Sequence, residues 1–357
     1  MKRALLRAAA AGAAAVLAVS ATAQPASADT WRKVDLPFLW PGAGIRDISA
    51  AASDNVWIAG VQGSFCIQPV AMWPCVISSS GNPVVRHWDG SRWREYPING
   101  WGDFGADAAM RRVVVGGGET WIYGGSSNSY LAAFNGRAFD PSEPPGDGNL
   151  VGLHGGAAGV WARMGESGGD ALYRRAGGAW VRTPVPADLR YVNDIQARTP
   201  TDAWAVGQTE PSRNRYGVPD FPAIAHWDGS SWTSVPAHTE SGAGERLIGV
   251  APVGAGEVWA ITRATLLHWD GATWTTIPGP PGMTEMRTLA ADDTGTPWAI
   301  MRMSSYEFKL FRHGDGAWQE VQVSPTGTVT ELDAVPGTGE LWATGGEGRS
   351  PAVFTDS

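Results

Sequence analysis

Short apolar runs centred on tryptophan recur along this chain, and most are followed by an Asp-Gly turn and a second aromatic. The clearest copy joins Ala203–Gly207 to His226–Trp232, which reads His-Trp-Asp-Gly-Ser-Ser-Trp. Two further copies join Val56–Gly60 to His87–Trp93 and Val258–Ile261 to His268–Trp274. Self-similarity at a spacing of a few tens of residues is the signature of a repeat fold. The repeat therefore indicates the architecture before any single residue does.

Seven tryptophans mark seven repeat units, spaced 39 to 64 residues apart with a mean near 47. They are Trp57, Trp121, Trp161, Trp204, Trp259, Trp298 and Trp342. Weaker copies keep the turn, as in Asn135-Gly136 between two phenylalanines and in Asp315-Gly316 before Trp318. We expect the seven tryptophans to occupy equivalent positions in seven units.

Each unit predicts four short strands. In the fourth unit these are Val192–Ala197, Ala203–Val206, Ala223–Trp227 and Trp232–Val235. Asp-Gly between two apolar runs favours a hairpin, because glycine tolerates the positive φ of tight turns. After the N-terminus no segment keeps a 3.6-residue apolar period, so helices should be scarce. Four-stranded units of this length, repeated seven times, predict an all-β, seven-bladed β-propeller of antiparallel blades.

The last unit predicts only three strands, Thr330–Val335, Glu340–Thr344 and Pro351–Phe354. A matching fourth strand stands near the N-terminus, where Trp31–Pro37 resembles Trp232–Pro236. We predict that Trp31–Leu36 pairs antiparallel with Ala352–Thr355 and completes the seventh blade. An open ring would expose a sheet edge and an apolar blade face.

Residues 1–28 have the pattern of a secretory signal. A basic start of Lys2, Arg3 and Arg7 precedes the apolar run Ala8–Val19 and the small residues Ala26–Ala28. Ala21–Ala23 is a second candidate cleavage site. We expect a secreted, extracellular protein in which residues 29–357 form a single β-propeller domain.

The charge balance limits the partners. The chain carries 27 basic and 35 acidic residues, a net charge of −8, which becomes −11 without the three basic residues of the signal. An acidic protein is a poor partner for nucleic acid or an anionic membrane surface. No later apolar run is long enough to cross a bilayer. We therefore expect a soluble monomer with neither nucleic-acid binding nor membrane insertion.

Cys66 and Cys75 are the two cysteines of the chain. Two neighbouring cysteines in an exported protein favour a disulfide. Closing so short a loop stabilises the fold by roughly 2.5–3 kcal/mol on the entropic model. A free or metal-binding pair is the alternative, although no further ligand lies close by in the sequence.

Repeated histidines and aspartates could suggest chemistry. Metal ligands must converge within a few ångströms, whereas equivalent positions of different blades lie far apart around a ring. We therefore expect the histidines to hydrogen-bond within their own blades and the aspartates to satisfy their turns. The residues concerned are His87, His226, His268 and His313, and Asp89, Asp228, Asp270 and Asp315. The sequence predicts no catalytic set, no metal site and no cofactor.

The pattern Trp-x-x-Gly followed by His-Trp-Asp-Gly-x-x-Trp resembles the units of secreted bacterial β-propellers, broadly kelch/galactose-oxidase-like or Asp-box-like. The likeness covers nearly all of residues 31–357. Asp89 and Gly90 are adjacent, whereas Asp-box turns separate the two residues by one position. Gly124-Gly125 and Gly345-Gly346 approach the glycine pair of kelch units. The resemblance implies a fold and no particular activity.

Ligand contacts are expected on one face of the ring. In a propeller, the loops between strands two and three share a face with the connections between blades, and here the longest are 61–83 and 208–222. Loops on a rigid scaffold are where binding groups concentrate. The candidates are Trp40, Trp73, Trp101, Phe104, Arg213, Arg215, Tyr216 and Phe221. The alternative is that these aromatics hold their own loops in place.

Two classes of function remain. The sequence favours an extracellular binding or interaction protein that presents the long-loop face to a glycan or a protein. The alternative is a secreted hydrolase or lyase that acts on polysaccharide, with acids and bases on the same face. Its candidates are Asp103, Asp107, Glu210, Asp220, His238 and Glu240.

Overall fold

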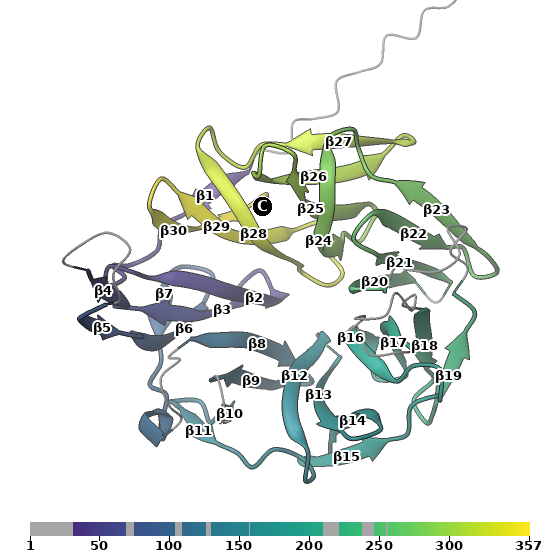
Figure 1. The fold of residues 1–357 in the computed structure, drawn as a ribbon, viewed down its shortest axis with the longest axis horizontal. Helices are drawn as coiled ribbons and strands as arrows, with labels where there is room; N and C mark the ends of the chain where they lie inside the picture. The colour runs from purple at the N-terminus through teal and green to yellow at the C-terminus, as the bar shows by residue number, and fades with distance from the viewer. Residues whose placement is uncertain are drawn as a thin grey trace, which may run out of the picture.

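A computed structural model describes residues 31–68, 75–103, 109–125, 130–156, 158–209, 221–237, 246–254 and 256–357. The signal expected at residues 1–28 lies outside them. Seven four-stranded antiparallel sheets stand around a central axis (Figure 1). The chain is therefore the seven-bladed β-propeller that its repeat predicts. The helical content of the described residues is one short 3₁₀ turn, η1 (Trp101–Asp103).

Each blade runs from a first strand at the central axis to a fourth strand at the rim (Figure 1). Blades 1 to 3 comprise β2 (Gly44–Ala52), β3 (Asn55–Gln62), β6 (Asn82–Trp88) and β7 (Trp93–Glu95); β8 (Met110–Gly116), β9 (Glu119–Gly124), β10 (Tyr130–Phe134) and β11 (Phe139–Pro141); and β12 (Asn149–Gly156), β13 (Gly159–Glu166), β14 (Gly169–Ala176) and β15 (Ala179–Thr183).

Blades 4 to 6 comprise β16 (Tyr191–Thr199), β17 (Asp202–Gln208), β18 (Pro222–Trp227) and β19 (Trp232–Val235); β20 (Gly249–Gly254), β21 (Glu257–Ile261), β22 (Thr265–Trp269) and β23 (Trp274–Pro278); and β24 (Met283–Ala291), β25 (Pro297–Met303), β26 (Phe308–Gly314) and β27 (Ala317–Val321). Blade 7 comprises β28 (Gly327–Ala334), β29 (Leu341–Glu347), β30 (Ser350–Thr355) and β1 (Arg32–Val34).

The seven tryptophans of the repeat are equivalent. Each lies in the second strand of its blade, and at most 7% of its surface is exposed. Each pairs with the same position of the first strand, and the partners are Ser49, Val114, His154, Gln196, Ala251, Ala290 and Asp333. A shared register across seven sheets confirms the sequence alignment of the units.

These tryptophans fill the wedges between blades. Trp161 of blade 3 packs on Trp227 and Trp232 of blade 4, with ring centroids 5.5 and 5.1 Å apart. Trp342 of blade 7 packs in the same way on Trp93 of blade 1. Large flat side chains suit this position because neighbouring blades diverge from the axis. Each interface between blades thus has its own apolar cluster around one tryptophan.

The Asp-Gly turns are built as expected in three blades. Gly90, Gly229 and Gly271 have φ of +85°, +98° and +93°. In the first of these turns, the Oδ1 atom of Asp89 accepts the backbone N–H groups of Ser91 and Arg92. The Ser91 hydroxyl donates to the same oxygen, and this bond, together with the two backbone bonds, holds the pKa of Asp89 well below its usual range. The carboxylate thus stabilises the turn.

Two of the four repeated histidines, His87 and His226, hydrogen-bond within their own blades. His87 Nε2 lies 3.0 Å from Asn55 Oδ1, and His226 Nε2 lies 2.9 Å from Asp202 Oδ1. His268 instead stacks on Trp259, and its Nε2 atom has no hydrogen-bond partner among the described residues. The expectation that His313 shares this position is wrong, because Arg312 pairs with Trp298 and His313 pairs with Trp318.

The sixth blade also departs from the expected turn. Asp315 has a φ of +53° inside a two-residue turn, instead of standing before a longer one. The shorter turn shifts the pairing of β26 by one residue relative to the third strands of blades 4 and 5. Asp315 is therefore not the equivalent of Asp89, although both precede a glycine.

Strands from the two ends of the described chain meet in the seventh sheet. β1 pairs antiparallel with β30, and Arg32, Lys33 and Val34 stand opposite Thr355, Phe354 and Val353. Trp31 packs edge-on against Trp298, with centroids 6.3 Å apart. The paired segments are those that the resemblance between Trp31–Pro37 and the other fourth strands indicates.

Candidate functional site

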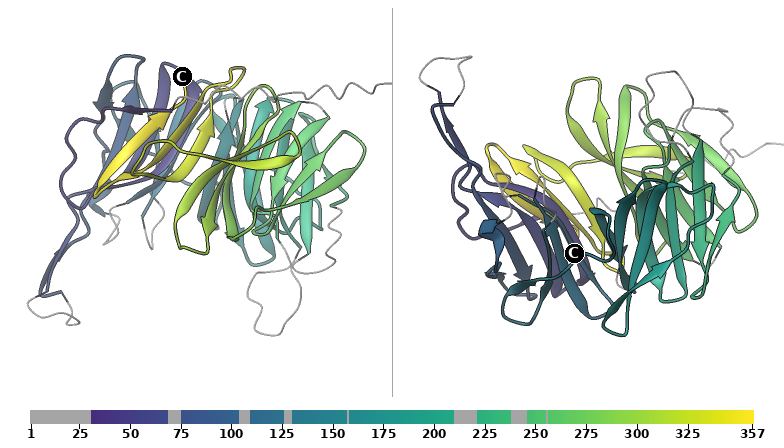
Figure 2. Two further views of the ribbon diagram at one scale, coloured as in Figure 1. Left: turned by 90° about the horizontal axis from the view of Figure 1, so that it is seen from above. Right: turned by 60° about the horizontal axis from the view of Figure 1, so that its bottom comes forward.

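The loops divide between two faces of the ring because the strands of each blade alternate in direction. Connections between strands two and three lie on the same face as connections between blades, which we call the long-loop face. In blade 1 this connection carries an extra two-stranded sheet, β4 (Phe65–Ile67) with β5 (Ile77–Ser79). The hairpin extends away from the ring (Figure 2).

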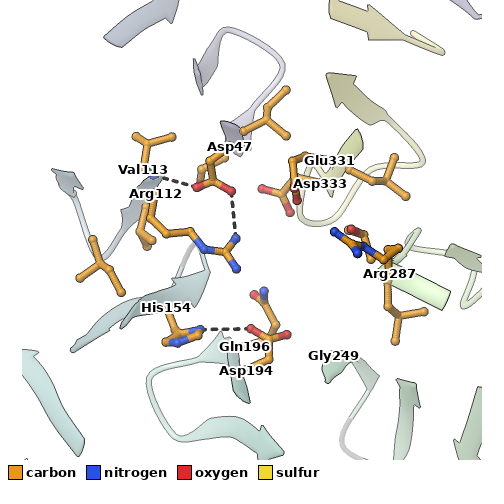
Figure 3. A pocket seen from close by; sticks show the side chains of 18 of the residues that line it. Asp47, Arg112, Val113, His154, Asp194, Gln196, Gly249, Arg287, Glu331 and Asp333 are labelled. Atoms are coloured by element: carbon orange, nitrogen blue, oxygen red, sulfur yellow. Dashed lines mark hydrogen bonds and ion pairs between the residues drawn. The ribbon is translucent and has the colours of Figure 1, made fainter. Parts of the chain in front are cut away.

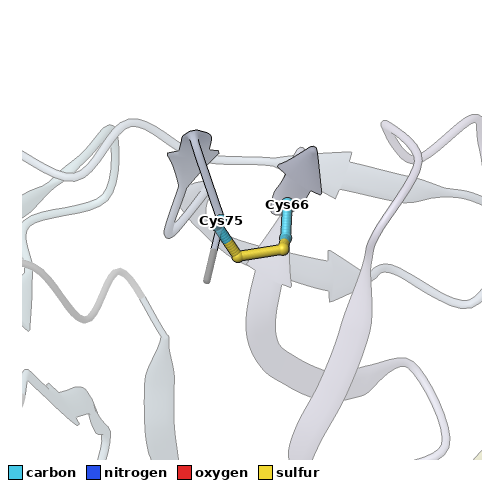
Figure 4. Close-up of a disulfide and its surroundings, with 2 residues drawn as sticks. All are labelled: Cys66 and Cys75. Carbon is cyan, nitrogen blue, oxygen red and sulfur yellow. A yellow bond between two sulfur atoms is a disulfide. The ribbon is translucent and has the colours of Figure 1, made fainter. Parts of the chain in front are cut away.

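A disulfide closes this hairpin. Cys66 in β4 is bonded to Cys75, with Cα atoms 5.4 Å apart (Figure 4). Beside it, the Val76 N–H donates a hydrogen bond of 3.0 Å to the Ile67 carbonyl. The disulfide predicted from the sequence is present, and it ties together two strands that have little other support.

The hairpin exposes large apolar side chains. The exposed fractions are 50% for Phe65, 51% for Ile67, 62% for Val76 and 58% for Ile77. Groups of this size are normally buried, and a gathering of them on a surface marks an interaction site.

Two further aromatics stand at the base of the hairpin. Trp40 is 62% exposed and Phe38 is 71% exposed, and their rings meet edge to face at 5.6 Å. The Trp40 N–H donates to Gln62 Oε1 at 3.3 Å. The Arg86 guanidinium donates to the carbonyls of Pro37 and Phe38. The backbone thus holds both rings in place at the surface.

We call Phe38 and Trp40 together with Phe65, Ile67, Val76 and Ile77 the apolar hairpin surface. Of the residues predicted from the sequence, it contains Trp40 and surrounds Cys66 and Cys75. Sequence reasoning passed over its aliphatic members. The signal that could have found them is the apolar composition of a loop that should be polar.

The other predicted contacts fall in different places. Trp101 is half-buried in η1, where it packs on Tyr130 at 5.3 Å and against Val61, so it supports its own connection. Phe221 is 47% exposed next to β18, across the ring from the hairpin (Figure 1). Trp73, Phe104, Arg213, Arg215 and Tyr216 lie outside the described residues. So do the candidates of the hydrolase alternative, including the side chain of Asp103.

A second site, which sequence reasoning missed, lies in the central channel. A cavity of about 220 Å³ is lined by the first strands of the blades. Its charged or titratable side chains come from the first strands of six blades (Figure 3). They are Asp47, Arg112, His154, Asp194, Arg287, Glu331 and Asp333.

Three of these carboxylates join neighbouring blades. Asp47 accepts the Val113 N–H at 2.8 Å, Asp194 accepts the Val250 N–H at 3.1 Å, and Asp333 accepts the Ala50 N–H at 2.8 Å. Each donor belongs to the first strand of the following blade, whose inner edge has no strand partner. The carboxylates therefore satisfy sheet edges that would otherwise be open.

Charge pairing in the channel is incomplete. Arg112 donates to Asp47 at 2.9 Å, and His154 Nδ1 lies 3.3 Å from Asp194. Burial raises the pKa of both Glu331 and Asp333 to about 7, against the weaker opposing effect of Arg112 on Glu331 and of backbone donors on Asp333. Burial lowers the pKa of His154. Carboxylates with such pKa values exchange protons near neutrality.

A sequence signal for the channel exists. Six of the first strands carry a β-bulge at the same repeat position. The residue directly after the bulge is polar or small, and apolar residues stand on both sides of this pair. The pattern is visible in Ile45–Ile48, Met110–Val113, Val192–Ile195 and Val329–Leu332. A bulge turns the strand locally and redirects side chains.

Comparisons with known proteins show the fold alone. The WD40 β-propeller domain of Doa1 matches with a TM-score of 0.58 and 11% identity over 91% of this chain and 96% of that one. YCF48 bound to D1 peptide matches with a TM-score of 0.57 and 16% identity, over 91% of this chain and 96% of that one. Virginiamycin B lyase from Staphylococcus aureus matches with a TM-score of 0.60 and 13% identity, over 91% of this chain and 98% of that one.

No family model and no curated protein matches the chain. The resemblance to kelch-like or Asp-box-like propellers therefore stays a prediction. Within the described residues, no group of three or more His, Cys, Asp or Glu side chains is placed to hold a metal ion. No helix in the described part of the chain has the length and apolar composition needed to cross a membrane.

Proposed function

We propose that this protein is an extracellular binding protein that holds a protein partner on the apolar hairpin surface. The observation that carries the proposal is the exposure of Phe65, Ile67, Val76 and Ile77, each at least half exposed on a disulfide-closed hairpin. Exposing such side chains to water is unfavourable by about 25 cal/mol per Å² of apolar area, so covering them would drive association.

The extracellular location is supported by two features. Residues 1–28 carry the basic, apolar and small-residue pattern of a secretory signal. The Cys66–Cys75 disulfide suits an oxidising compartment.

The chemistry of the surface favours a protein over a glycan. Glycans offer hydroxyl groups that need many hydrogen-bond partners, whereas the described hairpin residues 65–68 and 75–81 carry no charged side chain. Aliphatic side chains beside exposed aromatics are typical of protein interfaces. β4 and β5 also form a sheet of two strands alone, so each has one edge to which an extended segment of a partner can add.

The structural neighbours support binding as the type of function. YCF48 has been solved with a D1 peptide bound, on the same fold. The likeness extends to the ring of blades, while the apolar hairpin surface is argued from this chain alone.

The proposal can be tested by peptide selection. A random peptide library displayed on phage is selected against the native, oxidised protein, and a glycan array is probed in parallel. The test variant is Ile67→Asp, which places a charge in the middle of the surface. The matched control is Val181→Asp, because Val181 is also an exposed aliphatic residue, at 47%, but lies on the rim strand β15.

Peptides that bind the native protein and Val181→Asp but not Ile67→Asp would support the proposal. Peptides that bind all three proteins equally would place the site elsewhere. Glycan binding that disappears in Ile67→Asp would support the apolar hairpin surface as the binding site but would show that its ligand is a glycan and not a protein. Failure of both libraries to yield a ligand would reject the proposed function.

A further inference from the structure

The central channel is open beyond the charged cavity. A wider cavity of about 470 Å³ adjoins it and shares Ser49, Gln196, Leu289 and Asp333 as lining residues. Its outer lining includes Asp292-Asp293 and Pro336-Gly337, which lie in the turns between strands one and two of blades 6 and 7. The channel therefore opens on the face opposite the long-loop face. This opening is separate from the apolar hairpin surface.

The two cavities differ in character. The inner one, which we call the chamber, is lined by charged and polar groups. The outer one, which we call the mouth, is lined by small apolar residues, including Ala50, Ala251, Val253, Ala290 and Ala291, together with the charged residues Arg198, Asp292 and Asp293. A ligand that enters the channel thus meets apolar surface next to two carboxylates and one guanidinium before it reaches the chamber.

Charges in the chamber favour a cation. Four carboxylates line it, those of Asp47, Asp194, Glu331 and Asp333, against the guanidinium groups of Arg112 and Arg287. The Arg287 guanidinium is about half exposed and donates to Glu285. The chamber therefore keeps an excess of acceptors.

Two groups that line the chamber, the partly buried Glu331 and the buried His154, have unused bonding capacity. Glu331 makes no hydrogen bond or ion pair within the described residues, and it enters the channel beside Asp333 (Figure 3). His154, of which 6% is exposed, lines the same chamber, and its Nε2 atom has no hydrogen-bond partner among the described residues. Leaving a polar group without a partner away from water is unfavourable in free energy. A ligand that reaches them would recover that free energy.

We propose that the channel binds an organic cation, a primary amine or a guanidinium, with its charged end against Glu331 and Asp333 and its carbon chain in the mouth. The cation is either a free molecule or the end of a lysine or arginine side chain, since both offer the same charged group. A bare metal ion fits less well, because the described residues place no three ligands together.

Protonation of the chamber supports this assignment. With pKa values of about 7, Glu331 and Asp333 are partly protonated at neutral pH. A bound cation would lower both pKa values and release protons. The other charged groups that face them are Asp47 on β2, Arg112 on β8, Asp194 on β16 and Arg287 on β24, with His154 on β12. Binding should therefore strengthen as pH rises from 6 to 8.

Calorimetry on the native protein tests the proposal. The free amine is represented by agmatine, the side chain by the tripeptide Gly-Lys-Gly, and 1-butanol is the uncharged control. The test variant Glu331→Gln removes the charge and keeps the size. The matched control Glu166→Gln removes a carboxylate at the end of β13 that pairs with Arg182 on the rim strand β15 of blade 3. A second variant, Arg287→Gln, removes a half-exposed positive charge and should tighten binding.

The expected result at pH 8 is binding of agmatine or the tripeptide, with about a tenfold loss in Glu331→Gln and none in Glu166→Gln. Heats measured in two buffers should show proton release on binding. Equal affinity of Glu331→Gln and native protein, binding of butanol as tight as that of the amines, or no binding by any of them would overturn the proposal. Peptide binding to the apolar hairpin surface should survive Glu331→Gln, so the two proposals fail separately.

Discussion

Replacing Trp204 with alanine tests whether the repeated tryptophans hold neighbouring blades together. Only 3% of Trp204 is exposed, and it packs with Leu247 and Val250 of the following blade. Burial of ~150–250 Å² of indole contributes about 4–6 kcal/mol gross at ~25 cal/mol per Å². The cavity left by truncation relaxes only in part, so we expect a loss of about 3–5 kcal/mol in the free energy of unfolding.

Polar contacts should add little to this loss. The indole Nε1–H donates to Asp202 Oδ1 at 3.2 Å, but that carboxylate also pairs with Arg198 and with His226. Asp202 therefore keeps partners after the substitution. The expected magnitude reflects the lost packing between blades 4 and 5.

The assay is urea denaturation followed by circular dichroism, with Trp40→Ala as the control. Trp40 is the same residue type but 62% exposed, so its truncation should cost no more than about 0.5 kcal/mol. A loss below about 1 kcal/mol for Trp204→Ala would refute the reasoning. An equal loss in both variants would show that the effect is unrelated to blade packing.

Three further outcomes are expected. A chain that begins at Leu39 lacks the strand that pairs with β30, so its urea midpoint should fall and its light scattering should rise; unchanged unfolding would contradict a stabilising role for that strand. Mass measurement of the exported protein should find Cys66 and Cys75 oxidised, and replacing both with serine should weaken peptide binding while the blades stay folded. Glu331→Gln should gain stability over the native protein as pH rises, because a carboxyl whose pKa is raised by burial to about 7 stabilises the fold only while it is protonated. The gain should be small at pH 5 and reach about 2 kcal/mol at pH 8, and a gain that does not depend on pH would argue against a partly buried carboxylate without a partner.

The sequence determined the blades because each blade is a local structure. Its four strands follow one another along the chain in all but the first blade, where β4 and β5 intervene, and the seventh, which includes β1; one tryptophan always stands in the second strand. The strand expected at Trp232–Val235 has the same bounds in the structure. Tight turns with positive φ at Gly229 and Gly271 set the pairing of their flanking strands, so local rules were sufficient there.

Register in the sixth blade was beyond local rules. Arg312 and His313 are neighbours, and either could stand opposite Trp298 on composition alone. A turn one step shorter places Arg312 there, with its guanidinium 5.9 Å from the indole centroid. A cation over an aromatic face substitutes for the stacked histidine of other blades.

The charged chamber was decided by tertiary structure. Asp47, Asp194, Glu331 and Asp333 come from three first strands that are distant in the sequence, and each looks like an isolated polar residue in an apolar run. Their meeting requires a closed ring, because only a ring brings seven first strands around one axis. Burial there, and not the residues themselves, raises the pKa of Glu331 and Asp333. The sequence specifies each strand through residues that are close together along the chain. The electrostatic potential inside the channel depends on charges from several blades, so it arises only when the ring is closed.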